Sequence, residues 1–182
     1  MKVYKKREFI PIVKYNPEFR DENGVYQREE WTSRSDVGKV FGKAVFEEKE
    51  YIRVEEKYIA AFFLVLSCFK SDSIKIDSLF KHTKKKRFEK YNDLHLFDTY
   101  ISLKEREIVK YKETISKIIR LALREYIQAE LLVDRKSKSQ IIFGFDYHMY
   151  LKTNLEVSNL LIEVEKLGLF TRINKTGSSV LA

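Results

Sequence analysis

Cysteine and long apolar runs are nearly absent from this chain. Cys68 is the single cysteine among 182 residues, which excludes an intramolecular disulfide and favours a reducing compartment. The longest apolar run, Ile59 to Leu66, is far shorter than the ~20 residues that a membrane-spanning helix requires. The N-terminus has basic residues but only a very short apolar segment, unlike a signal peptide. We therefore expect a cytoplasmic protein without a membrane anchor, with Cys68 filling core volume.

The patterns that mark most enzyme sites are also missing. Three scattered histidines give no metal-ligand spacing, and we interpret Asp146 and His148 as a structural pair rather than a metal site. Gly38 and Gly42 lack the spacing of a phosphate-binding loop, and no serine lies in a nucleophile elbow. The pattern Glu47-Glu48-Lys49 fits the first turn of a helix better than a nuclease centre. We expect no enzymatic activity, no cofactor and no metal.

Positive charge is what the chain has in excess. The net charge of +8 and the pI near 9.3 favour polyanions or acidic partners. The densest basic run comprises Lys84, Lys85, Lys86 and Arg87. Phe88 and Tyr91 follow it, so cations that neutralise phosphates lie near aromatic rings that stack on bases. We prefer a solvated basic loop because no binding motif accompanies the run, and single-stranded nucleic-acid binding is the alternative.

Apolar residues make up 44% of the chain, enough for a packed core in one domain. Residues 8–15 and Val25–Trp31 are predicted to form a loose hairpin across the turn-rich string between them. Pro11 lacks an amide hydrogen, so the first strand belongs at a sheet edge or contains an irregularity. From Glu47, a helix is predicted from apolar residues at three- and four-residue steps: Tyr51, Val54, Tyr58, Phe62 and Leu66.

The second half of the chain predicts further strands and helices. A strand at Ile74–Leu79 precedes residues 81–100, which we interpret as a loop leading into an extended stretch. A helix is predicted from Lys104 to Glu125, and then two strands at 129–134 and 139–151. Alternation along the last strand predicts an apolar face with Phe143, Phe145, Tyr147, Met149 and Leu151, and a more polar face with Ile142, Gly144, Asp146, His148 and Tyr150.

The end of the chain has the signals of a capped helix. Asn154 is predicted as the N-cap of a helix over 155–167, and Gly168 as its stop in the left-handed conformation. A strand over 169–173 is expected to follow. We predict an α/β (α+β) fold in which one domain, residues 1–174, packs a mostly antiparallel sheet against three or more helices. We expect residues 175–182 to be a disordered tail or a remnant of expression.

The only tryptophan lies in a polar setting, within "YQREEWTSRSDVGKVFG" from Tyr26 to Gly42. A large aromatic side chain stabilises most when it is buried, so we predict that Trp31 packs in the core. A short helix is expected to follow, capped by a side-chain oxygen of Ser33, Ser35 or Asp36.

Two stretches resemble immunity proteins of bacterial contact-dependent growth inhibition systems, in particular those paired with nuclease toxins. They are "YQREEWTSRSDVGKVFGKAVFEEKEYIRVEEKY" and "LALREYIQAELLVDRKSKSQIIFGFDYHMYL", and "EKLGLFTRI" follows them. The resemblance implies a small cytoplasmic α/β protein without catalytic activity. It also implies one protein partner, the cognate toxin domain delivered by a neighbouring cell, which the chain binds and blocks. In some such systems a toxin β-hairpin adds to the sheet of the immunity protein.

The toxin-binding residues that we predict are Glu29, Glu30, Asp146, His148 and Tyr150, although flanking the core is an equally good interpretation of them. Nuclease inhibitors are often acidic, whereas this chain is basic. Three explanations stay open. The toxin surface is acidic, or binding depends on strand addition and local carboxylates, or the toxin is not a nuclease.

Overall fold

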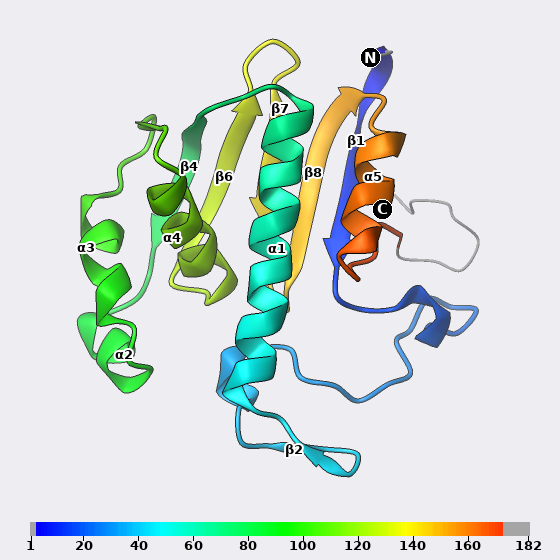
Figure 1. The fold of residues 1–182 in the computed structure, drawn as a ribbon, viewed down its shortest axis with the longest axis vertical. Helices are drawn as coiled ribbons and strands as arrows, with labels where there is room; N and C mark the ends of the chain where they lie inside the picture. Colours follow the sequence, from blue (N-terminus) through cyan, green and yellow to red (C-terminus); the bar gives the residue numbers. More distant parts are fainter. Residues whose placement is uncertain (1–2, 173–182) are drawn as a thin grey trace.

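The computed structural model describes residues 3–172 and places three helices over one face of a six-stranded antiparallel sheet (Figure 1). The strand order is β1-β8-β7-β6-β4-β5. The strands are β1 (Val3–Val13), β4 (Ile74–Lys81), β5 (Ile108–Val109), β6 (Ile127–Asp134), β7 (Ser139–Phe143) and β8 (His148–Leu155). The covering helices are α1 (Glu48–Cys68), α4 (Lys112–Leu123) and α5 (Ser158–Lys166). The predicted α+β class is confirmed.

Smaller elements lie around this core. Helix α3 (Leu94–Ser102) lies next to α4, and α2 (Lys85–Lys90) packs against α3 (Figure 1). A separate hairpin joins β2 (Val40–Phe41) to β3 (Ala44–Val45). Two 3-10 turns, η1 (Pro17–Phe19) and η2 (Arg34–Asp36), lie in the long connection between β1 and α1.

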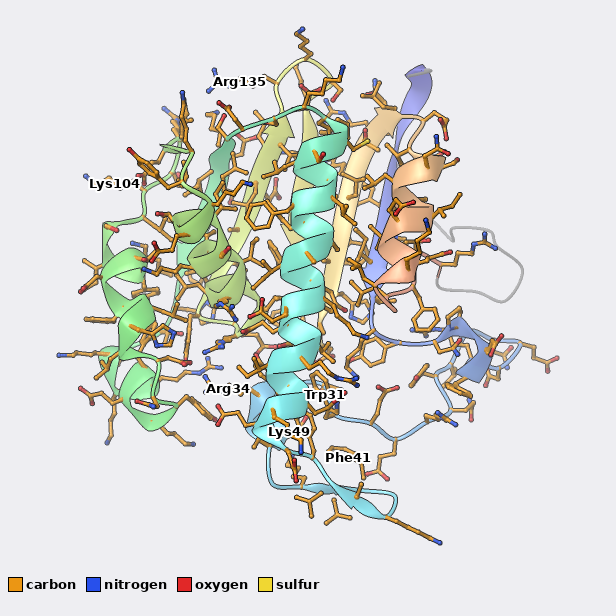
Figure 2. All side chains as sticks on the ribbon, in the orientation of Figure 1. Trp31, Arg34, Phe41, Lys49, Lys104 and Arg135 are labelled. Carbon is orange, nitrogen blue, oxygen red and sulfur yellow. The ribbon has the colours of Figure 1, made fainter. Side chains whose placement is uncertain are left out.

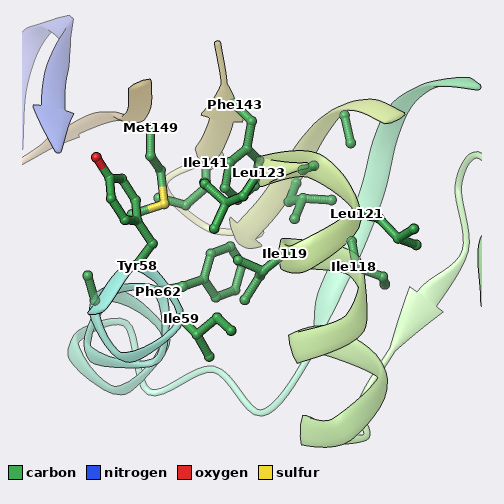
Figure 3. Close-up of a cluster of buried hydrophobic side chains, with 14 of the residues drawn as sticks. Tyr58, Ile59, Phe62, Ile118, Ile119, Leu121, Leu123, Ile141, Phe143 and Met149 are labelled. Atoms are coloured by element: carbon green, nitrogen blue, oxygen red, sulfur yellow. The ribbon is translucent and has the colours of Figure 1, made fainter. Parts of the chain in front are cut away.

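The core forms between the helices and the inward face of the sheet. In β6 every second side chain is buried, while α1 and α4 bury residues at three- and four-residue steps, as their sequence periods predict. Phe62 of α1 and Ile119 of α4 meet Ile141 of β7 in this layer (Figure 3). Each such fully buried side chain contributes about 1.5–3 kcal/mol through loss of apolar surface from water. Cys68 is half-buried and packs at the edge of the core, and burial raises the pKa of its thiol.

The edge position predicted from Pro11 is confirmed, because β1 pairs only with β8 within the sheet. The predicted hairpin is wrong. Val25–Trp31 forms no strand, and a single bridge joins Arg20 to Tyr26. The Asp21 side chain accepts hydrogen bonds from the backbone amides of Asn23 and Val25, which closes a tight local turn instead.

Residues 139–151 form two strands rather than the predicted one. Asp146 and Tyr147 have φ values of 54° and 59°, and the Gly144 amide donates to the His148 carbonyl at 2.8 Å, so the chain reverses here. The reversal overturns the predicted alternation. Phe145 is 64% exposed, whereas Tyr147 is buried.

Two predicted boundaries in the middle of the chain also differ. Residues 81–100 contain α2 and α3 rather than an extended stretch. Residues 104–111 are not helical because they pair with β4: the Arg106 amide donates to the Ile76 carbonyl at 2.7 Å and the Ile76 amide donates to Glu107 at 2.9 Å. Helix α4 therefore begins only at Lys112.

The last helix begins later than predicted. Strand β8 continues to Leu155 through pairing with β1, so Asn154 lies in a strand and α5 begins at Ser158. Gly168, with φ of 76°, ends the helix as predicted. Of the strand expected at 169–173, the described residues 169–172 form one bridge, between Phe170 and Val13. The tail 175–182 lies outside the described residues.

Candidate binding site

The structure brings together four of the five predicted toxin-binding residues, Glu30, Asp146, His148 and Tyr150, where β1 ends and β8 begins. The Tyr15 hydroxyl donates to the Asp146 carbonyl at 2.8 Å, and the Tyr15 ring stacks on His148 with centroids 5.3 Å apart. Glu30 accepts hydrogen bonds from Lys14, at 2.6 Å, and from Tyr26. The hydrogen bond from Tyr15 to Asp146 thus joins residues that are 131 positions apart in the sequence.

A row of aromatic rings in stacked and edge-on contact runs through this region. Tyr150 stacks on His148, His148 on Tyr15, and Tyr15 meets Tyr26 edge-on with centroids 5.3 Å apart. Tyr26 then meets Phe19 edge-on, and the Arg28 guanidinium lies 3.4 Å from the Phe19 centroid. We call Phe19, Tyr26, Tyr15, His148 and Tyr150 the aromatic row. Tyr15 is buried and the other four are half-buried, so the row has a fixed interior and an accessible side.

Charge at the row is mixed. Burial lowers the pKa of Lys14, and the neighbouring carboxylate of Glu30 opposes this shift. Burial also raises the pKa of the Tyr15 hydroxyl, and the negative charges of Asp146 and Glu30 add to it. Both carboxylates therefore act on the same two groups, although the chain as a whole is basic.

Trp31 is buried near the row, which confirms its predicted packing role. It is 8% exposed and stacks on Phe46 with ring centroids 4.4 Å apart. The Lys14 ammonium lies 4.2 Å from the Trp31 centroid. Asp36 caps the following turn, since its carboxylate accepts from the backbone amides of Thr32 and Ser33, at 2.9 and 3.1 Å.

Glu29 and the predicted Asp146–His148 pair differ from expectation in their contacts. Glu29 is exposed and makes no hydrogen bond or ion pair with any residue from 3 to 172. The predicted Asp146–His148 pair forms through the backbone rather than the carboxylate, because His148 Nδ1 lies 3.2 Å from the Asp146 carbonyl and 3.1 Å from that of Phe145. Within the described part of the chain, no group of three or more His, Cys, Asp and Glu side chains is placed to hold a metal ion.

The basic run lies elsewhere and lacks one of the aromatic partners assigned to it. Lys84, Lys85 and Lys86 are exposed at the start of α2. Phe88 is fully buried against Tyr126, with centroids 4.1 Å apart, so it cannot stack on a base. Arg87 is half-buried and donates to the carbonyls of Glu125 and Arg124, at 3.2 and 3.4 Å.

A second polar site was not predicted from the sequence. Glu55 and Asp93 are buried, with only 0% and 1% of their surface exposed. Both bind Arg124, which is itself buried. Arg124 donates to Glu55 through Nε and Nη2, each at 2.7 Å, and to Asp93 through Nη1 at 2.5 Å. This network joins α1, α4 and the turn before α3.

The network forms one wall of a cleft of about 730 Å³, near the N-terminal end of α1 where Arg34 lies (Figure 2). Its lining residues are Arg34, Ser35, Val37, Glu48, Ile52, Glu56, Lys90, Tyr91, Asn92, Asp93, His95, Arg120 and Arg124. Tyr51 lies between Trp31 and this network, since its ring is 5.8 Å from that of Trp31 and 5.9 Å from the Arg124 guanidinium. A signal for the network is present in the sequence, since Glu55 lies on the apolar stripe of the predicted helix between Tyr51 and Tyr58.

Comparison of this chain with protein-family models, curated proteins and solved structures finds no match. No helix in the described residues has the length and apolar character to cross a membrane.

Proposed function

We propose that this chain is an immunity protein, which binds in the cytoplasm to the toxin domain of a contact-dependent growth inhibition effector and neutralises it. The observation that carries the proposal is the aromatic row, since tyrosine, phenylalanine and arginine are enriched at protein interfaces and dominate their binding energy. Exposed Phe145 lies in the turn before His148 and adds an apolar anchor.

The row is suited to binding because its side chains are held before a partner arrives. Tyr15 is fixed by Asp146, and Tyr26 by Glu30, so little rotamer freedom is lost on association. Glu29 and the Asp146 carboxylate are both exposed beside these fixed groups. They place two exposed carboxylates beside the row on a basic chain, which favours the explanation in which local carboxylates recognise the toxin.

Strand addition at the outer edge of β1 is less favoured by the geometry. Val13 already exchanges two backbone hydrogen bonds with Phe170 on that edge, at 2.9 and 2.7 Å. A toxin strand along the whole of β1 would have to displace this segment, whereas the aromatic row is accessible as it stands.

Titration calorimetry with the purified toxin domain encoded upstream tests the proposal. We expect Tyr150→Ala and Asp146→Asn each to weaken binding by about tenfold or more, because they remove an anchor ring and a charge from the interface. Asparagine tolerates the left-handed conformation of residue 146, so the turn is kept. Asp98→Asn is the matched control, since Asp98 is exposed on α3, away from the row. Unchanged affinity in both test variants would contradict the proposed surface.

A further inference from the structure

Arg34 and Arg120 are held in the same unusual way on the cleft. Each donates through Nη1 to a buried carboxylate, Asp93 for Arg34 and Glu55 for Arg120. Each also donates through Nη2 to an exposed carboxylate of α1, which is Glu48 for Arg34 and Glu56 for Arg120. One half of each guanidinium is thus fixed from inside the protein, and the other half faces a solvent-exposed side chain. Nη2 of Arg34 also donates to the Tyr91 carbonyl, at 2.9 Å.

The two outer carboxylates are weakly held compared with the inner ones. The Glu48 and Glu56 side chains are 56% and 53% exposed, whereas those of Asp93 and Glu55 are 1% and 0% exposed. Exposed ion pairs contribute little to stability because water screens them and flexible side chains must be ordered. Glu48 and Glu56 can therefore rotate into solvent while the inner carboxylates keep both guanidinium groups in place.

We propose that the cleft binds an acidic segment of a partner protein, whose carboxylates replace Glu48 and Glu56 on Arg34 and Arg120. A guanidinium fork matches a carboxylate geometrically, and its charge-assisted hydrogen bonds are among the strongest in proteins. Lys90 lines the same cleft and makes no ion pair with any described residue, so it adds an uncompensated positive charge.

The spacing of the two positions defines the segment further. Glu48 and Glu56 are eight residues apart on α1, which corresponds to about 12 Å along the helix axis. Half-buried Ile52 lies midway between them on the cleft wall, and Val37 lines the cleft as well. Two acidic groups with an apolar side chain between them fit this arrangement. A nucleic-acid backbone would supply the anions but no apolar group for Ile52.

This inference does not depend on the partner being a toxin, because the competition between outer carboxylates and an added anion is a property of the chain alone. The test uses fluorescence anisotropy of a short fluorescein-labelled poly-L-glutamate, titrated with the full chain. The Glu48→Gln, Glu56→Gln double variant removes both competitors. We expect it to bind the peptide about tenfold more tightly than the unchanged protein, and Lys90→Gln to reduce the gain.

The matched control removes two other exposed carboxylates, Glu113 and Glu163, each of which pairs with a lysine outside the cleft. Glu113→Gln, Glu163→Gln gives the same change in net charge, and we expect affinity close to that of the unchanged protein. Equal tightening in the control, or none in the test variant, would overturn the proposal. Tighter binding of a labelled oligothymidylate than of poly-L-glutamate to the test variant would overturn the protein partner in favour of nucleic acid.

Discussion

Replacing Glu55 by glutamine tests whether the buried ion pairs hold α1 and α4 together. The side chain is 0% exposed and accepts three hydrogen bonds, two from Arg124 and one from Arg120. Glutamine keeps the shape but removes the charge. Arg124, whose side chain is 4% exposed, then keeps only Asp93 as an ionic partner. Breaking a buried pair costs about 3–5 kcal/mol because it leaves a charge that is neither neutralised nor hydrated.

Glu56→Gln is the comparison, because Glu56 follows Glu55 directly and binds the same Arg120 while being 53% exposed. An exposed pair contributes about 1 kcal/mol or less. The free energy of unfolding, measured by urea denaturation with circular dichroism, should thus fall several times further in Glu55→Gln. The thermal melting midpoint of Glu55→Gln should lie about 10 °C below that of the unchanged protein. Equal losses in the two variants would refute the inference that burial, rather than pairing, determines the cost.

Three further predictions concern stability. Trp31→Ala should cost about 3–5 kcal/mol, since the ring is 8% exposed, and an unchanged thermal melt would move Trp31 from the core to the binding surface. Phe145→Ser should change the free energy of unfolding by less than about 0.5 kcal/mol, because this ring is 64% exposed; a large loss in urea denaturation would show that it packs. Burial raises the pKa of Tyr58 and of Tyr147 well above 10.0, so the folded state holds these protons more tightly. Their contribution to stability is complete below pH 10.0 and falls as the pH rises further. If urea denaturation gave the same free energy of unfolding below and above pH 10.0, the result would contradict this.

The elements that depend on residues close to one another in the sequence were predicted correctly. The apolar steps from Tyr51 to Leu66 predicted α1, because a helix buries one stripe wherever its partners come from. Gly168 predicted the end of α5 for a similarly local reason, namely its left-handed backbone. Pro11 predicted an edge strand because it cannot donate to a neighbour.

Features that depend on distant residues were not predicted. The turn at 144–147 interrupts what is locally a good strand pattern, and it is stabilised by Tyr58, whose hydroxyl donates to the Tyr147 carbonyl at 2.5 Å. The loop before α4 is extended because it pairs with β4. The network of Glu55, Asp93 and Arg124 joins three separate segments, so Glu55 on the apolar stripe indicates a buried charge but not its partners.

At the candidate site too, local features were predicted from the sequence and contacts between distant residues were not. Glu30, Asp146 and His148 were proposed as partner-facing from the resemblance and from strand alternation. In the structure Tyr15 contacts Asp146 and His148 directly, and Tyr26 links it to Glu30. Tyr15 itself was not singled out, because nothing near it in the sequence indicates a contact with residue 146. A tyrosine at the end of a predicted edge strand was the only available signal.

Bacterial survival tests the central claim most directly. The toxin domain encoded upstream is expressed in a susceptible strain, alone, with this chain, or with an unrelated immunity protein. The proposal predicts that this chain restores growth and that the unrelated protein does not. Continued killing by an active toxin in the presence of soluble, folded chain would contradict neutralisation by binding.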